Sequence, residues 1–88
     1  MVTVFIPAMF QSLTSGVTFV EIDASNVRDV IQNLDNLFPG LQSKLIKNGH
    51  IKEELAVSID GDLARMGLME KVPADSEIHF IPAIAGGI

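Results

Sequence analysis

The N-terminal part of the chain alternates apolar residues with other residues in a two-residue period. Val2, Val4 and Ile6 share one parity. Because successive side chains of a strand point to opposite faces, this pattern predicts a strand with one face in a core. Residues 7–16 contain the Ser, Thr and Gly that favour turns, and a second strand is predicted over 17–23. The first quarter of the chain is therefore predicted to form a β-hairpin with a long loop.

A helical period follows and predicts one main helix over residues 26–37. Ser25 and Asn26 are preferred N-cap residues, and Pro39-Gly40 stops the pattern. A helix with a single apolar stripe buries that stripe against one neighbouring layer, so this helix should pack across one face of a sheet. The apolar positions of the stripe are Val27, Val30, Ile31, Leu34, Leu37 and Phe38.

The second half of the chain predicts two further strands. Residues 55–59 form a short apolar run closed by an Asp-Gly turn, and residues 77–81 alternate again. Between the main helix and these strands, residues 41–46 suit one more helical turn, broken by the following Asn-Gly pair. Residues 62–69 are expected to add a stub of strand.

These elements predict an α+β domain with one helix on a four- to five-stranded mixed sheet. The domain is expected to span residues 1–82, and residues 83–88 are expected to form an extended, flexible C-terminal tail. One face of the sheet is then left to solvent or to a partner. By alternation, Phe5 and Ile81 point away from the helix, which makes them candidates for an exposed apolar, partner-binding face.

Composition narrows the possible functions. The chain has 88 residues, of which 48% are hydrophobic and 19% charged, as expected for one globular domain with little room for a buried catalytic cavity. Its net charge of −5 disfavours nucleic acid and anionic membrane surfaces as partners. With no cysteine and two histidines, we expect no thiolate nucleophile and no bound metal. The sequence has neither a basic leader nor an apolar run of membrane-spanning length, so a cytoplasmic protein is expected.

Four segments carry a resemblance to a known family. Three lie within the domain, Leu13-Thr14-Ser15-Gly16, Leu37-Phe38-Pro39-Gly40-Leu41 and Val57-Ser58-Ile59-Asp60-Gly61, and the fourth runs from Ile81 through the diglycine Gly86-Gly87. Together they resemble the ubiquitin-like sulfur carriers, the family of the molybdopterin synthase small subunit, the thiamine thiazole sulfur carrier and the mycobacterial cysteine-synthesis carrier. This resemblance implies a β-grasp fold.

The resemblance also implies a chemistry for the tail. The carboxylate of Gly87 would be adenylated by a ubiquitin-activating-type enzyme that uses ATP and a sulfur donor, and would become a thiocarboxylate for a sulfur-accepting synthase. The protein would then be a carrier rather than an enzyme, with no cofactor of its own. Ala85, Gly86 and Gly87 would thread the partner's active site, because residues without a Cβ enter narrow channels. A fully extended tail from Ala83 to Gly87 reaches at most about 17 Å.

One residue departs from the family pattern. Carriers ready for activation end at the second glycine, whereas this chain continues with Ile88. We therefore expect a processing site at Gly87 and Ile88, cut by a metallopeptidase. Two alternatives stay open: a protein modifier joined through Gly87 to lysine, and a binding subunit that never reacts. The final acceptor is also open among cysteine or homocysteine, molybdopterin, thiamine and a specialised metabolite.

Overall fold

The structure is a computed structural model that describes residues 1–82 of the 88-residue chain. The predicted tail, residues 83–88, lies outside the described residues. In chain order the elements are β1 (Val2–Phe5), the 3-10 turn η1 (Ala8–Phe10), β2 (Phe19–Ile22), α1 (Val27–Leu37), α2 (Leu41–Leu45), β3 (Ile46–Lys47), β4 (His50–Ile51), β5 (Leu55–Ile59), β6 (Asp62–Leu63), η2 (Gly67–Met69) and β7 (Glu77–Pro82).

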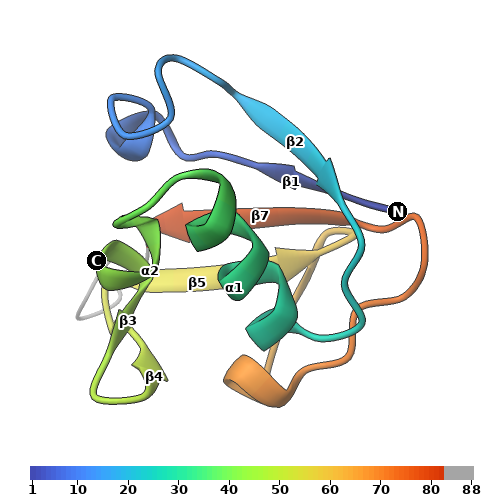
Figure 1. The fold of residues 1–88 in the computed structure, drawn as a ribbon. Coiled ribbons are helices and arrows are strands. Elements are labelled where there is room, and N and C mark those ends of the chain that lie inside the picture. The colour runs from blue at the N-terminus through green and yellow to red at the C-terminus, as the bar shows by residue number, and fades with distance from the viewer. Residues whose placement is uncertain (83–88) are drawn as a thin grey trace.

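Five of the strands form one mixed sheet in the order β2-β1-β7-β5-β6. The β1 and β7 strands pair in parallel, although they lie at opposite ends of the sequence, and the other neighbours are antiparallel. Helix α1 crosses one face of this sheet (Figure 1). The predicted arrangement of one main helix on a mixed sheet is confirmed.

Local sequence signals explain where α1 begins. The Asn26 side chain accepts a hydrogen bond from the backbone N–H of Asp29 at 2.8 Å, and the Asp29 carboxylate accepts one from the Ser25 hydroxyl at 3.0 Å. The first bond satisfies a backbone N–H that the first turn of a helix leaves without an intrahelical partner, and the second ties the residue before the cap to that turn. After α1, Gly40 adopts a φ of 98°, a conformation that favours glycine, and the chain turns into α2.

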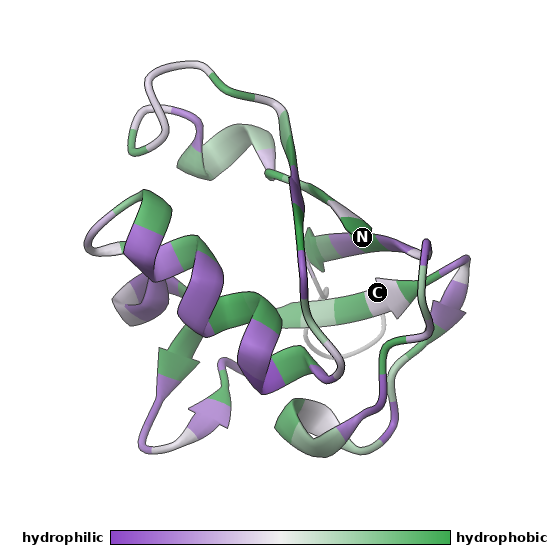
Figure 2. Cartoon of the chain, turned by 45° about the vertical axis from the view of Figure 1, so that its right-hand side comes forward, coloured by the Kyte–Doolittle hydropathy of each residue, from purple (hydrophilic) through white to green (hydrophobic). Residues whose placement is uncertain are grey.

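Helix and sheet enclose a single core. The buried stripe of α1 consists of Val27, Val30, Ile31 and Leu34. The hydrophobic side of α1 lies along one flank and its hydrophilic side along the other (Figure 2). The alternating strand positions complete the core from the sheet: Val2, Val4, Ile22, Leu55, Val57, Ile59, Ile78 and Phe80.

Three local predictions need correction. Leu37 was predicted in the buried stripe but is 53% exposed, because Leu41 and Leu45 of α2 are buried instead as the chain turns after α1. Ile46 was predicted in the further helical turn but starts the hairpin β3–β4, which turns at Asn48 and Gly49, both at positive φ, where a break was predicted. Two-residue strands are too short to show alternation, so only the Asn-Gly turn could have signalled the hairpin. Within residues 62–69 only Asp62–Leu63 is a strand, and Gly67–Met69 is a 3-10 turn.

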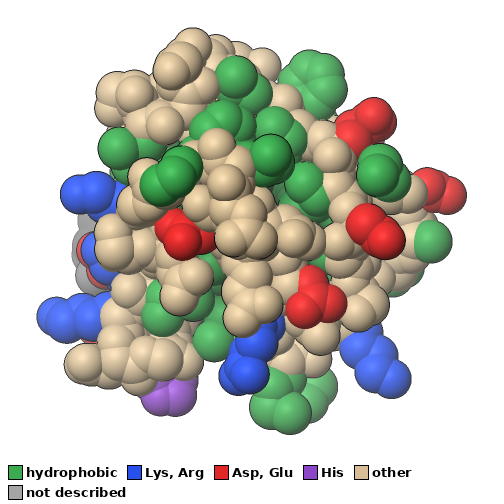
Figure 3. Space-filling model, in the orientation of Figure 1, with side chains coloured by type: hydrophobic (Ala, Val, Ile, Leu, Met, Phe, Trp, Pro, Cys, Tyr) green, Lys and Arg blue, Asp and Glu red, His purple; other side chains and the backbone are tan. Residues whose placement is uncertain are grey.

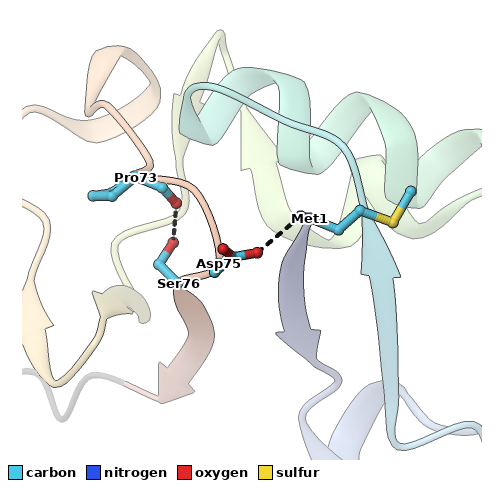
Figure 4. Close-up of polar contacts among 4 residues, drawn as sticks. All are labelled: Met1, Pro73, Asp75 and Ser76. Atoms are coloured by element: carbon cyan, nitrogen blue, oxygen red, sulfur yellow. Dashed lines mark hydrogen bonds and ion pairs between the residues drawn. The ribbon is translucent and has the colours of Figure 1, made fainter.

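The turn before β7 places that strand beside β1. The Ser76 hydroxyl donates to the carbonyl of Pro73 at 2.7 Å, and the N-terminal ammonium of Met1 pairs with Asp75 at 3.1 Å (Figure 4). The backbone N–H of Thr3 also donates to the carbonyl of Ser76 at 2.9 Å. Together these contacts hold the start of β7 against the start of β1. No helix within residues 1–82 is long and apolar enough to cross a membrane.

Candidate functional site

The predicted reaction site lies beyond β7. This strand is central in the sheet, between β1 and β5, and its last residue, Pro82, pairs with Leu55. Residues 77–79 pair with β1 and residues 78–82 with β5, so pairing with β5 extends to the residue from which the tail continues. The predicted site residues Ala85, Gly86, Gly87 and Ile88 lie outside the described residues, so their roles stay predictions.

The face of the sheet opposite α1, here called the outer face, carries a row of aligned side chains. Residues paired across neighbouring strands share a face of the sheet, and strand registers place five of them side by side. In spatial order the row is Phe19, Phe5, His79, Ser58 and Leu63. We call it the outer row.

Aromatic contacts order the centre of the outer row. The rings of Phe5 and His79 stack with centroids 4.4 Å apart and planes 11° apart. Phe19 leans against the other side of Phe5 at 5.9 Å and 37°. Because these three rings hold each other in place, they form a preorganised surface, and a surface of that kind loses little side-chain entropy on binding.

The outer row has exposed apolar ends and a neighbour toward the tail. Phe19 is 54% exposed, Leu63 60% and Ile81 40%. Ile81 lies on β7 two residues after His79, opposite Ala56 of β5. Phe5 is half-buried beneath its two ring neighbours. The structure thus places both predicted residues, Phe5 and Ile81, on the outer face; their binding role stays a prediction.

Sequence reasoning missed three members of this surface. Phe19 could have been placed from its parity in the second strand, but Leu63 depends on pairing with Ser58. The sequence did not single out His79, which is half-buried and stacked on Phe5. That contact follows from the parallel pairing of β1 with β7, which no local pattern reveals.

The outer face turns from apolar to acidic at the end where β7 starts. Glu21 of β2 and Glu77 of β7 lie on either side of Thr3 in register. Asp60 is tied to the same end, because its carboxylate accepts the backbone N–H of Glu77 at 2.8 Å. The apolar and acidic parts of the outer face therefore lie at different distances from the tail.

The pockets on the surface of residues 1–82 are shallow. One of about 330 Å³ lies against the β3–β4 hairpin and is lined by Lys47, His50, Lys52 and their neighbours. Among residues 1–82 there is no group of three or more His, Cys, Asp or Glu side chains that could hold a metal ion. The outer face is therefore the surface feature that best suits a functional role.

Comparison with known proteins connects this geometry to a family. The sequence model of the ThiS family matches residues 4–87. The chain belongs to the ThiS family. This ThiS-family protein is accordingly a member of the ubiquitin-like sulfur carriers, which confirms the resemblance drawn from its loops and tail. Comparison with curated protein sequences gave no significant match.

Solved structures confirm the β-grasp fold. One chain of the Amycolatopsis orientalis BexX/CysO complex has a TM-score of 0.90 and 27% identity, over 99% of this chain and 100% of that one. Mycobacterium tuberculosis CysO has a TM-score of 0.88 and 21% identity, over 96% and 100% of the two chains. SAMP1 from Haloferax volcanii has a TM-score of 0.73 and 24% identity, over 98% of each chain. The ThiS-family protein is therefore similar to these chains over nearly their whole length.

Proposed function

We propose that this ThiS-family protein carries sulfur as a thiocarboxylate on Gly87, after removal of Ile88. The observation that carries the proposal is the family match, which runs through the diglycine and ends at Gly87. The position of β7 supports it, because a central strand leads directly into the reacting tail.

The proposed chemistry needs no redox step when hydrosulfide is the sulfur source. A carboxylate oxygen of Gly87 attacks the α-phosphorus of ATP, a new P–O bond forms, and pyrophosphate leaves. Hydrosulfide then attacks the carbonyl carbon, the bond from that carbon to the adenylate oxygen breaks, and AMP leaves with its electron pair. One oxygen of the original carboxylate departs in AMP and one sulfur replaces it. The partner enzyme supplies the ATP site and the sulfur source, and this chain supplies the acyl group.

Ile88 is the reason a processing step is part of the proposal. While Ile88 is attached, the carboxyl carbon of Gly87 is an amide, which has no free oxygen to attack ATP. The Ile88 side chain also branches at Cβ, which restricts its backbone and adds bulk where the two glycines make a narrow thread. Hydrolysis of this one peptide bond by a metallopeptidase would free the Gly87 carboxylate.

The outer face is the proposed docking surface for the adenylating enzyme and for the sulfur-accepting synthase. Phe5 and Ile81 supply apolar contact area, and the stacked rings of Phe5 and His79 make that area rigid. Rigid aromatic side chains are common anchors of protein interfaces. The structure in which CysO is in complex with BexX supports the idea that a carrier of this fold docks on a second protein. The final sulfur acceptor stays open among the pathways to cysteine or homocysteine, molybdopterin, thiamine and a specialised metabolite.

The test uses three chains: the full chain, a chain ending at Gly87 and a chain ending at Gly86. Each is mixed with the host's adenylating enzyme, ATP and sulfide, and pyrophosphate release and intact mass are followed. We expect activity from the chain ending at Gly87, with one oxygen exchanged for sulfur, and none from the other two. Equal rates from the full chain would refute the processing step, and no adenylation of any chain would refute the carrier.

A second function is favoured by one comparison. SAMP1, a small archaeal modifier protein, shares the fold over 98% of each chain. A modifier would transfer the same Gly87 acyl group to a lysine amine and form an isopeptide bond. Tagged chain ending at Gly87, added to host lysate with ATP, would then produce a ladder of heavier adducts, whereas a carrier would give only the thiocarboxylate mass.

A further inference from the structure

The acidic end of the outer face contains two carboxylates with a fixed spacing. Glu21 and Glu77 are both exposed, and Thr3 separates them across β1. Neighbouring strands lie about 4.8 Å apart, so the two backbone positions are separated by about 10 Å. Along each strand, the backbone positions of Glu21 and Glu77 lie only about 7 Å from those of Phe19 and His79 in the outer row.

These carboxylates have no cationic partner within the described part of the chain. The one ion pair among residues 1–82 joins the Met1 ammonium to Asp75. Figure 3 shows the side of the molecule that α1 covers, where most Asp and Glu side chains lie toward the right, near the N-terminus, and Lys and Arg lie to the left and along the lower edge. On the outer face, which this view does not show, Glu21 and Glu77 form an acidic end with no ion pair among residues 1–82.

A partner that covers the outer row must also cover these two residues. A standard protein interface takes about 800 Å² from each partner, which is a patch about 30 Å across. The whole domain measures 32 × 28 × 23 Å, so a patch of that size centred on Phe5 extends over most of the outer face. Carboxylates that lose water without gaining a partner oppose binding.

We propose that the adenylating enzyme places two basic side chains, about 10 Å apart, opposite Glu21 and Glu77, and that these pairs orient the carrier. The inference rests on the proposed function and names the chemistry of the partner's surface. Apolar contact with the outer row is non-directional, so it does not by itself select one orientation. Glu77 begins β7 and Pro82 ends it, about 17 Å away. Ion pairs at the Glu77 end therefore direct the tail end toward the active site.

The test measures binding of the chain ending at Gly87, the form that the proposed function makes reactive, to the host's adenylating enzyme by calorimetry. Glu21→Lys and Glu77→Lys each reverse one charge, and Glu77→Gln removes one. Asp62→Lys is the matched control: it makes the same charge change at an exposed residue that pairs with the core residue Ile59 and so lies on the other face of the sheet. Circular dichroism verifies the fold of each variant, and Glu77→Gln serves if a lysine variant fails to fold.

We expect each lysine variant on the outer face to raise the Kd at least about tenfold at low salt. Asp62→Lys should change the Kd less than about twofold. The difference in Kd between the outer-face lysine variants and Asp62→Lys should become smaller near 0.5 M salt, where charges are screened. Equal weakening by Glu77→Lys and Asp62→Lys would overturn the inference, because only net charge would then matter. Failure of the chain ending at Gly87 to bind without any substitution would instead overturn the proposed function.

Discussion

Replacing Leu34 with alanine tests the architecture that creates the outer face. Leu34 lies in the buried stripe of α1 and is 0% exposed. The substitution removes three carbon groups at about 0.8 kcal/mol each, or about 2.4 kcal/mol of transfer free energy. The cavity left behind adds to this figure, so the expected loss is about 3 to 5 kcal/mol. A domain of this length has a free energy of unfolding of roughly 4 to 13 kcal/mol, so the loss is a large share of it.

Leu37 offers a matched control on the same helix. It is 53% exposed, and Leu37→Ala is the same chemical change, so we expect a loss below about 0.5 kcal/mol. Urea unfolding followed by circular dichroism gives both free energies, and thermal unfolding should show Leu34→Ala melting at least about 10 °C lower. If the two variants lie within about 0.5 kcal/mol of each other, burial does not distinguish the positions and the packing of α1 on the sheet is wrong.

Two further predictions concern the outer face and the start of α1. Phe5→Asp and Ile81→Asp should each weaken binding to the adenylating enzyme by about 2 kcal/mol or more, with the fold retained. Leu37→Asp, on α1, is the control and should leave the Kd unchanged. Loss of the folded circular-dichroism spectrum, or equal Kd values for all three variants, would contradict this prediction. Asn26→Ala should lower the free energy of unfolding by about 1 kcal/mol, because the N–H of Asp29 loses its acceptor. Asn36→Ala on the exposed side of α1 is its control, and equal losses would show that the cap has no effect.

Much of the fold could be predicted because its signals are local. Alternation of Val2, Val4 and Ile6 identifies a buried strand face wherever the strand pairs. Asn26 caps the helix through a contact only three residues long, and the Pro39-Gly40 pair ends it near the predicted position. The candidate reaction site, Gly87, was likewise found from sequence, because the diglycine follows the last strand at the position that the family match covers.

The outer face depended on information that no local pattern contains. Periodicity assigns a residue to a face of its own strand, but register with the neighbouring strands decides which side chains meet. The stack of Phe5 on His79 joins residues 74 positions apart and exists because β1 and β7 pair in parallel. The spacing of Glu21 and Glu77 on either side of Thr3 has the same origin.

The sequence by itself determined the main helix and its cap, the longer strands, the parity of Phe5 and Ile81, and the family to which the chain belongs. Only the tertiary structure decided that Phe19, Phe5 and His79 form one row and that an acidic end lies beside it. The physical reason is that strand order and register arise from burying all strands against α1 at once, a condition set by contacts far apart in the chain.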